Sequence, residues 1–252
     1  MRDSCVVLLG HGSRDPAANE EHERLAQAVR ARRPDWRIQT AYLERAQPGL
    51  AEALEVASTG ARRVVVMPLL LFAAGHLKKD VPSALAEVRV RFPNVTFVAA
   101  QALGVHPGLV DLAWQRVASA VSPDPASFAK TLLLVVGRGA SDPDANADFL
   151  EVARRIGDGR GLLHLQVAFL AMAEPRVEAS LEIVARMRPD RLVVLPYLLY
   201  AGRLLCDLAQ RVQAFASGHP GIETALAGHL GVGDRLMAVV EERVRQALGE
   251  AP

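Results

Sequence analysis

The second half of the chain repeats the first half at a constant shift of 127 residues. Segment 7–16, Val-Leu-Leu-Gly-His-Gly-Ser-Arg-Asp-Pro, aligns with segment 134–143, Leu-Val-Val-Gly-Arg-Gly-Ala-Ser-Asp-Pro. The same shift pairs Pro48 with Pro175 and the tripeptide 103–105 with 230–232. Agreement at one shift along the whole chain indicates a duplication. We therefore predict two homologous domains, residues 1–122 and 128–252, joined by the Pro- and Ser-rich stretch 122–127.

Composition excludes several classes of protein. The 29 basic and 28 acidic residues give a net charge of +1, which argues against a broad nucleic-acid surface. Two cysteines without a C-x-x-C spacing argue against a disulfide scaffold and favour a reducing compartment. The longest apolar run, 64–74, contains Pro68 and falls short of the about 20 residues of a membrane-spanning helix. With no signal-peptide core before Gly10, we expect a cytoplasmic protein without membrane or nucleic-acid partners.

Short apolar runs alternate with longer amphipathic segments in each repeat. In the first repeat this pattern predicts strands at 5–10, 37–43, 63–70 and 95–100, and helices at 19–32, 48–57, 81–91 and 107–121. The strand runs are almost continuously apolar, as is typical of strands that are buried on both faces. Each repeat should therefore be an α/β domain with a four-stranded parallel sheet and helices on both faces.

Three metal-binding residue types follow the predicted strands of the first repeat. His11 directly follows the first strand, Glu44 closes the second, and His76 lies in the loop after the third. Ligands bind at the carboxyl ends of the strands in open parallel sheets. If the first strand lies between the other two, neighbouring ends are about 4.8 Å apart. Two imidazoles and a carboxylate then form a suitable set for a divalent transition metal with open coordination positions.

A lone histidine after a strand more often hydrogen-bonds its own loop, so the repeat is needed to weigh this hypothesis. The second repeat carries Arg138, Ala171 and Arg203 at the three equivalent positions, whereas the flanking glycines persist. Arginine stays protonated and cannot ligate a metal. Because all three donors are missing together from one repeat, we interpret them as one functional set.

Other candidate sites are weaker. We expect His22, on a polar helix face, and His219 to be solvated, and His106 either to cap a helix or to line a cleft. Ser13 lies too close to His11 for a hydrolase triad, and no G-x-S-x-G sequence occurs. The two G-x-G pairs lack the third glycine of a dinucleotide-binding fingerprint, and no Walker A sequence is present.

Taken in order, these motifs resemble those of the class II tetrapyrrole chelatases, and within them the long, tandem-duplicated form of the sirohydrochlorin cobaltochelatase family. The resemblance is carried by Leu-Gly-His-Gly-Ser-Arg at 9–14, Tyr-Leu-Glu at 42–44, and the run from Pro68 to His76. It covers nearly the whole chain and implies two flavodoxin-like domains facing each other across a cleft. It also implies that His11, Glu44 and His76 bind the incoming metal and are the catalytic residues. Some members carry functional histidines in the second half, where this chain has arginines, so we place the working site in the first repeat.

The resemblance implies a function: insertion of a divalent metal, Co²⁺ before Fe²⁺ or Ni²⁺, into the small-molecule substrate sirohydrochlorin, with release of two protons. No permanently bound cofactor is expected, because the metal is a substrate. One histidine would accept a pyrrole proton, and the residues do not decide which. The alternatives are a sirohydrochlorin ferrochelatase, a carrier of metal or tetrapyrrole without turnover, and an α/β protein whose histidines recognise an anion.

An anionic macrocycle requires cationic side chains around the metal site. Arg14, Arg45, Lys78 and Lys79 lie beside the three ligands in the sequence. We expect them to bind substrate carboxylates, with ordinary solvated charge as the alternative for each. Pseudo-twofold packing would also bring Arg138 and Arg203 to the substrate, where guanidinium groups are suited to carboxylates.

Overall fold

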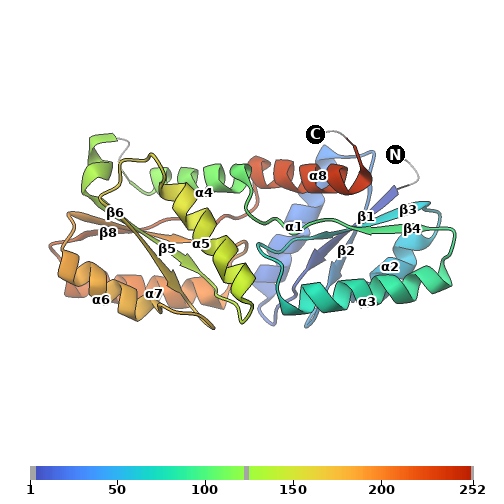
Figure 1. The fold of residues 1–252 in the computed structure, drawn as a ribbon, viewed down its shortest axis with the longest axis horizontal. Helices are drawn as coiled ribbons and strands as arrows, with labels where there is room; N and C mark the ends of the chain where they lie inside the picture. The colour runs from blue at the N-terminus through green and yellow to red at the C-terminus, as the bar shows by residue number, and fades with distance from the viewer. Residues whose placement is uncertain (1–3, 122–124, 251–252) are drawn as a thin grey trace. The chain divides into compact units, whose positions relative to one another are not determined.

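A computed structural model describes residues 4–121 and 125–250. Strands and helices alternate through the first repeat (Figure 1): β1 (Ser4–Gly10), α1 (Pro16–Arg32), β2 (Arg37–Tyr42), α2 (Leu50–Ser58), β3 (Arg63–Pro68), α3 (Gly75–Arg91), β4 (Thr96–Ala99) and α4 (Pro107–Ser119). The four strands form a parallel sheet in the order β2-β1-β3-β4. The predicted α/β class is confirmed, and β1 lies between β2 and β3, as the predicted site requires.

The second repeat has the same order of elements: β5 (Thr131–Gly137), α5 (Pro143–Gly157), β6 (His164–Phe169), α6 (Val177–Met187), β7 (Arg191–Pro196), α7 (Arg203–Gly218), β8 (Glu223–Leu226) and α8 (Asp234–Leu248). Its parallel sheet has the equivalent order β6-β5-β7-β8. Of the predicted linker 122–127, residues 122–124 lie outside the described part of the chain. Residues 125–127 begin a 3₁₀ helix, η1 (Pro125–Lys130), which leads into β5.

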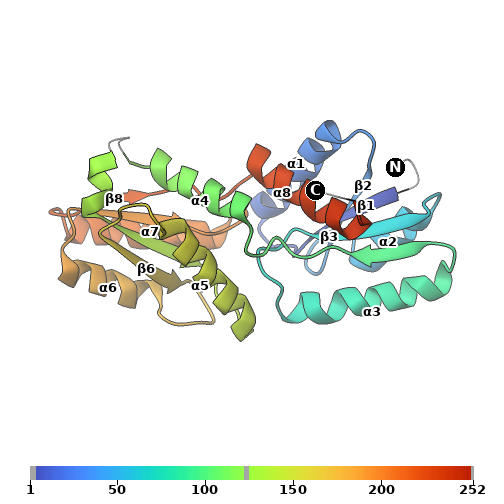
Figure 2. The ribbon, with the colours of Figure 1, turned by 45° about the horizontal axis from the view of Figure 1, so that its top comes forward.

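Alternation of side chains along β1 buries both faces of the first sheet. Cys5, Val7 and Leu9 pack in one apolar cluster with residues of α2 and α3. Val6 and Leu8, which are fully buried, point to the opposite face, where α1 and α8 contact the sheet (Figure 2). This two-sided burial explains why β1 reads as a continuous apolar run.

Helix α3 begins six residues earlier than predicted, at Gly75 instead of residue 81. Its buried side chains already follow a helical period from the first turn onward: Leu77, Val81, Leu85 and Val88. Pro82 therefore lies inside the helix, on its exposed side. His76 is consequently in the first turn of a helix and not in a loop.

No helix of the described residues has the length and apolar character needed to cross a bilayer.

The last helix of each repeat packs on the sheet of the other repeat. One compact unit contains residues up to Gly104 together with those from Val232 onward, and the other contains Val105–Gly231. Helix α8 packs on β3, β4 and α1, whereas α4 packs on β7 and α5 (Figure 1). The compact units therefore differ from our predicted division at residues 122–128, which follows the repeat boundary in the sequence. Periodicity identifies the helices but carries no information on which sheet each one covers.

Equivalent arginines anchor the two exchanged helices within their units. Arg243 of α8 donates from Nη2 to the carbonyl of Leu103 at 2.9 Å. Arg116 of α4 donates from Nη2 to the carbonyl of Leu230 at 2.7 Å. Each acceptor lies in the loop that follows the last strand of its sheet, and both donor and acceptor are related by the 127-residue shift. The exchange therefore follows the same pattern in both units.

Candidate metal centre

Main-chain pairing continues beyond the ends of β1 and β2 and brings two predicted ligands together. The Leu43 amide donates to the Gly10 carbonyl and the Glu44 amide to the His11 carbonyl, each at 3.0 Å. The side chains of His11 and Glu44 meet with 3.3 Å between Nε2 and Oε1. They remain 29% and 34% exposed, respectively. The pair is thus held by the sheet and open to an incoming ion.

The loop after β1 has a backbone that only glycine fits at residue 12. Gly12 has a φ of +83°, and a Cβ atom there would lie 1.7 Å from the Glu44 carbonyl oxygen. Asn19 of α1 makes two hydrogen bonds with the main chain of Ser13. Its Oδ1 accepts from the Ser13 amide at 3.0 Å, and its Nδ2 donates to the Ser13 carbonyl at 2.9 Å. The loop therefore passes tightly over Glu44 and returns to α1, whose first turn is capped by Asp15.

An imidazole nitrogen and a carboxylate oxygen at this separation suit a divalent transition metal. His76 is the second residue of α3, the helix that follows β3, and β3 pairs with β1. Its side chain lies outside what the structure describes. Within the described side chains, no group of three or more metal-binding residues converges. The structure thus brings His11 and Glu44 together, and the three-ligand set remains a prediction.

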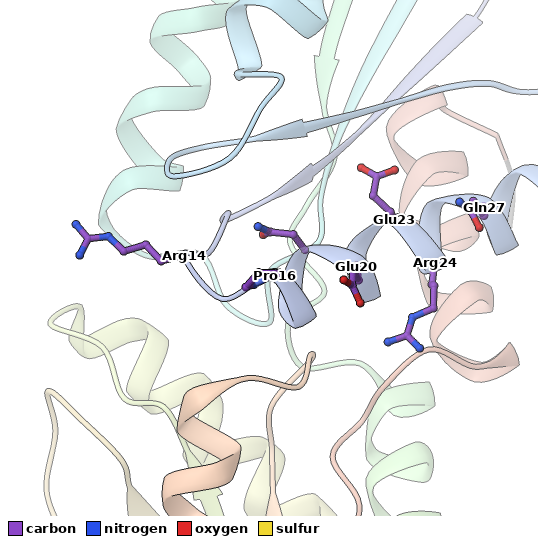
Figure 3. A pocket seen from close by; sticks show the side chains of 7 residues that line it. Arg14, Pro16, Glu20, Glu23, Arg24 and Gln27 are labelled. Carbon is purple, nitrogen blue, oxygen red and sulfur yellow. The ribbon is translucent and has the colours of Figure 1, made fainter.

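The four cations predicted beside the ligands have different surroundings. Arg45 has a left-handed φ of 63° and contacts Glu44, with 3.1 Å between Nε and Oε1. Arg14 is exposed and lines a hollow of about 560 Å³ along α1 (Figure 3). Lys78 and Lys79 are exposed on α3. Arg45 therefore pairs with the carboxylate of a predicted ligand, which sequence reasoning did not anticipate.

The second repeat has the same loop backbone without the donors. Gly139 also has a φ of +83°, and a Cβ atom there would lie 1.9 Å from the Ala171 carbonyl oxygen. The Ala171 amide donates to the Arg138 carbonyl at 2.8 Å. Arg138 is exposed, and Arg203 begins α7 with 88% of its side chain exposed and its Nε 3.8 Å from Asp207. The turn itself therefore requires neither a histidine nor a glutamate.

Our expectation that His22 is solvated is wrong. Its side chain is 1% exposed and packs beneath Gly10, where a Cβ atom would lie 2.8 Å from Nδ1. Burial lowers the pKa of His22 to about 4, although nearby Glu23 and a hydrogen bond with the Leu8 backbone partly oppose this shift. The acidic and basic neighbours in α1 made the helix face look polar. The repeat held the corrective signal, because the equivalent residue is Phe149.

Two further histidines can be compared with their predictions. His106 precedes α4, and its Nδ1 accepts from the Gly108 amide at 3.0 Å, which confirms the helix-capping alternative. His219 is half-buried and stacks on Phe215 with 4.3 Å between ring centroids, so the expectation that it is simply solvated is wrong.

Comparison with known proteins assigns a family and a fold. The sequence model of the CbiX family matches residues 5–120 and again 132–247. The chain is 29% identical over 248 residues to a sirohydrochlorin cobaltochelatase of Priestia megaterium, covering 96% of this chain and 79% of the relative. It is 28% identical over 246 residues to a sirohydrochlorin ferrochelatase of the same organism, covering 97% and 90%. The structure of SirB from Bacillus subtilis with Fe³⁺ shares the fold, with a TM-score of 0.84 at 24% identity over 97% of this chain and 95% of that one.

The two equivalent glycines separate folding from metal binding. We expect Gly12→Ala and Gly139→Ala each to lower the free energy of unfolding by about 1–3 kcal/mol. At both positions the alanine would have to adopt a positive φ, and its Cβ atom would clash with a main-chain carbonyl oxygen. Only Gly12→Ala should weaken Co²⁺ binding, because it displaces the main chain of Glu44. Denaturant unfolding and calorimetric Co²⁺ titration measure the two effects. Equal loss of Co²⁺ affinity in both variants would contradict the assignment of the metal site to the first repeat.

Buried His22 predicts a specific loss of stability in acid. The unfolded chain takes up a proton at this residue below its ordinary pKa of 6.5, whereas the folded chain does so only near pH 4. Between pH 7 and pH 4.5 this difference removes about 2–3 kcal/mol of folding free energy. We therefore expect His22→Phe to flatten the acid side of a pH–stability curve measured by thermal unfolding. His164→Phe, at an exposed position, is the control and should keep the wild-type slope.

Proposed function

Because the chain belongs to the CbiX family, we propose that it is a sirohydrochlorin chelatase that inserts a divalent metal and releases two protons. The observation that carries this proposal is the 3.3 Å contact between the His11 imidazole and the Glu44 carboxylate at the ends of β1 and β2. It is supported by the second repeat, whose equivalent loop has the same backbone but Arg138 and Ala171 in place of the donors. Two relatives that span most of the chain are a sirohydrochlorin cobaltochelatase and a sirohydrochlorin ferrochelatase.

In the proposed reaction, His11, Glu44 and His76 hold the metal substrate while it keeps some of its water. Glu44 is paired with Arg45 before the metal arrives. The incoming dication replaces the guanidinium as the charge partner of the carboxylate, so the site is not left with an uncompensated charge at either stage. Three protein donors leave coordination positions open for the ring nitrogens of the substrate.

Metallation also requires two pyrrole N–H protons to leave the macrocycle. As each proton passes to a base, the lone pair of that nitrogen becomes available for the metal, and the two negative charges of the ring balance the dication. A neutral imidazole suits this transfer, because its ordinary pKa near 6.5 lets it accept a proton and return it to water. We assign the acceptor role to one of the two ligand histidines, His11 or His76, whose ring nitrogen becomes free to accept a proton as the metal passes from it to the macrocycle.

We propose cobalt as the preferred metal. Two imidazoles and a carboxylate accept Co²⁺, Fe²⁺ and Ni²⁺, so the donor set does not discriminate strongly between them. The relatives include a cobaltochelatase at 29% identity and a ferrochelatase at 28%. Insertion of Fe²⁺ for siroheme is therefore the second candidate function, and direct competition between the two metals distinguishes them.

Turnover distinguishes the enzyme from a carrier. We expect the wild-type protein to metallate many equivalents of sirohydrochlorin, followed by the change in the ring's absorption spectrum with Co²⁺ or Fe²⁺. His11→Ala should slow the reaction by about 100-fold or more, because it removes both a metal ligand and a candidate base. His164→Ala removes an exposed histidine of the second repeat and should leave the rate unchanged. Metallation that stops at one ring per protein would identify a carrier.

Two arginines of the second repeat are proposed to bind substrate carboxylates. We expect Arg138→Ala and Arg203→Ala each to raise KM for sirohydrochlorin about tenfold, because each removes a charge-assisted hydrogen bond. The turnover number should change little. Arg186→Ala, which removes an exposed guanidinium from α6, is the matched control. Unchanged KM in both test variants would identify Arg138 and Arg203 as ordinary surface charges.

A further inference from the structure

A polar cluster of His22, Glu23 and Tyr42 lies beneath the loop that carries the proposed ligands. His22 and Tyr42 are 1% and 4% exposed, and their ring centroids are 4.8 Å apart. The Tyr42 hydroxyl donates to Glu23 Oε1 at 3.0 Å. Glu23 and Arg24 leave α1 in opposite directions, as Figure 3 shows, and both line the hollow along this helix. The cluster thus links α1 to the end of β2.

The second repeat fills the same three positions with apolar residues. Phe149, Leu150 and Phe169 replace His22, Glu23 and Tyr42, respectively. Phe149 packs on Phe169 with 5.1 Å between centroids and lies beneath Gly137, just as the imidazole lies beneath Gly10 in the first repeat. The packing geometry is therefore shared. Only the repeat that carries the proposed metal ligands makes it polar.

Contacts connect this cluster to the backbone of both ligands. The His22 ring supports Gly10, the residue before His11, and Tyr42 precedes Glu44 by two residues. The main-chain hydrogen bonds that align His11 with Glu44 begin at these supported positions, since Leu43 donates to the Gly10 carbonyl. The strength of a hydrogen bond depends on the direction between donor and acceptor, whereas the free energy of apolar packing does not. The bond from Tyr42 to Glu23 therefore restricts how far the end of β2 can shift along or away from α1.

Fold stability does not explain why the cluster is polar. Burying an imidazole and a phenol hydroxyl carries a desolvation cost that the phenylalanine pair of the second repeat avoids. Burial holds the pKa of His22 near 4, so the imidazole is neutral at physiological pH and places no positive charge beneath a cation site.

We propose that His22, Glu23 and Tyr42 are positioning residues, which set the separation of His11 and Glu44 by directional hydrogen bonds that join α1 to β1 and to β2. This inference rests on the proposed metal chelation and adds to it the residues that adjust metal affinity without touching the metal. Outer residues of this kind typically change metal affinity by about 10–100-fold.

The test uses substitutions that the second repeat itself provides. Tyr42→Phe and Glu23→Leu each remove the hydrogen bond and introduce the residue found at the equivalent position. His22→Phe introduces the equivalent aromatic ring beneath Gly10 and removes the hydrogen bond with the Leu8 backbone. Calorimetric titration of the full-length protein with Co²⁺ alone should give a Kd raised about tenfold in each variant. In the chelation assay, KM for Co²⁺ should rise by the same factor with kcat less affected, while the unfolding midpoint stays near that of the wild type.

Two controls separate positioning from general packing. Glu23→Gln keeps an acceptor for the Tyr42 hydroxyl and should retain the wild-type Kd. Phe169→Tyr adds a hydroxyl at the equivalent place in the second repeat and should leave Kd unchanged.

The outcomes distinguish this inference from the function on which it rests. If His11→Ala abolishes Co²⁺ binding but Tyr42→Phe and Glu23→Leu bind as the wild type does, the positioning role is overturned and the chelatase proposal stands. A loss of affinity that follows a fall in the unfolding midpoint would assign the cluster to folding alone and also overturn it. If the wild-type protein does not bind Co²⁺, or His11→Ala leaves binding unchanged, both proposals fail.

Discussion

The candidate site depends on main-chain hydrogen bonding that continues beyond the carboxyl ends of two neighbouring parallel strands, β1 and β2. The amides of Leu43 and Glu44 bind the carbonyls of Gly10 and His11, so the strand pairing continues into the first residues of the two loops. An imidazole and a carboxylate can then be held 3.3 Å apart by backbone geometry. Only glycine at position 12 lets this loop pass over the Glu44 main chain. The fold therefore places the backbones of His11 and Glu44 next to each other.

The duplication separates the scaffold from the chemistry within one molecule. Both repeats have the positive φ at the loop glycine, an asparagine that binds the loop from α1 or α5, and an aspartate that caps that helix. These shared features are explained by the need to connect a strand to a helix. Two features occur in the first repeat but not in the second. They are the predicted metal donors at the loop and the polar cluster of His22, Glu23 and Tyr42 beneath it, and they require another explanation. The proposed metal binding supplies one explanation for both.

Much of the fold and part of the site follow from the sequence alone. Apolar runs predict the parallel sheets because burial on both faces leaves a strong and local pattern. The placement of β1 between β2 and β3 is only a condition of the site hypothesis, and the structure meets that condition. The burial of His22 and the contact of Arg45 with Glu44 depend on side-chain direction, which a helix of mixed charge or a left-handed loop residue does not reveal. The start of α3 at Gly75 was missed because Pro82 reads as a first-turn residue, whereas the buried period begins at Leu77.

Exchange of the last helices explains why the fold of the first unit needs the second repeat, although the second repeat lacks the predicted metal donors. Helix α8 is encoded in the second repeat but covers β3 and β4 of the first sheet, where Arg243 binds the Leu103 carbonyl. In that unit Glu241 of α8 contacts Arg33, and in the other unit the equivalent arginine, Arg160, lies over the Trp114 ring of α4. Arg160 also makes an ion pair with Asp111 of α4, at 3.9 Å, so the second unit adds a cation–π contact at the attachment where the first unit uses the Arg33–Glu241 ion pair. The first sheet, which carries His11 and Glu44, is covered on both faces only when the second repeat contributes its helix. The second repeat lacks the three predicted donors, yet the fold of the first unit depends on the helix that it contributes.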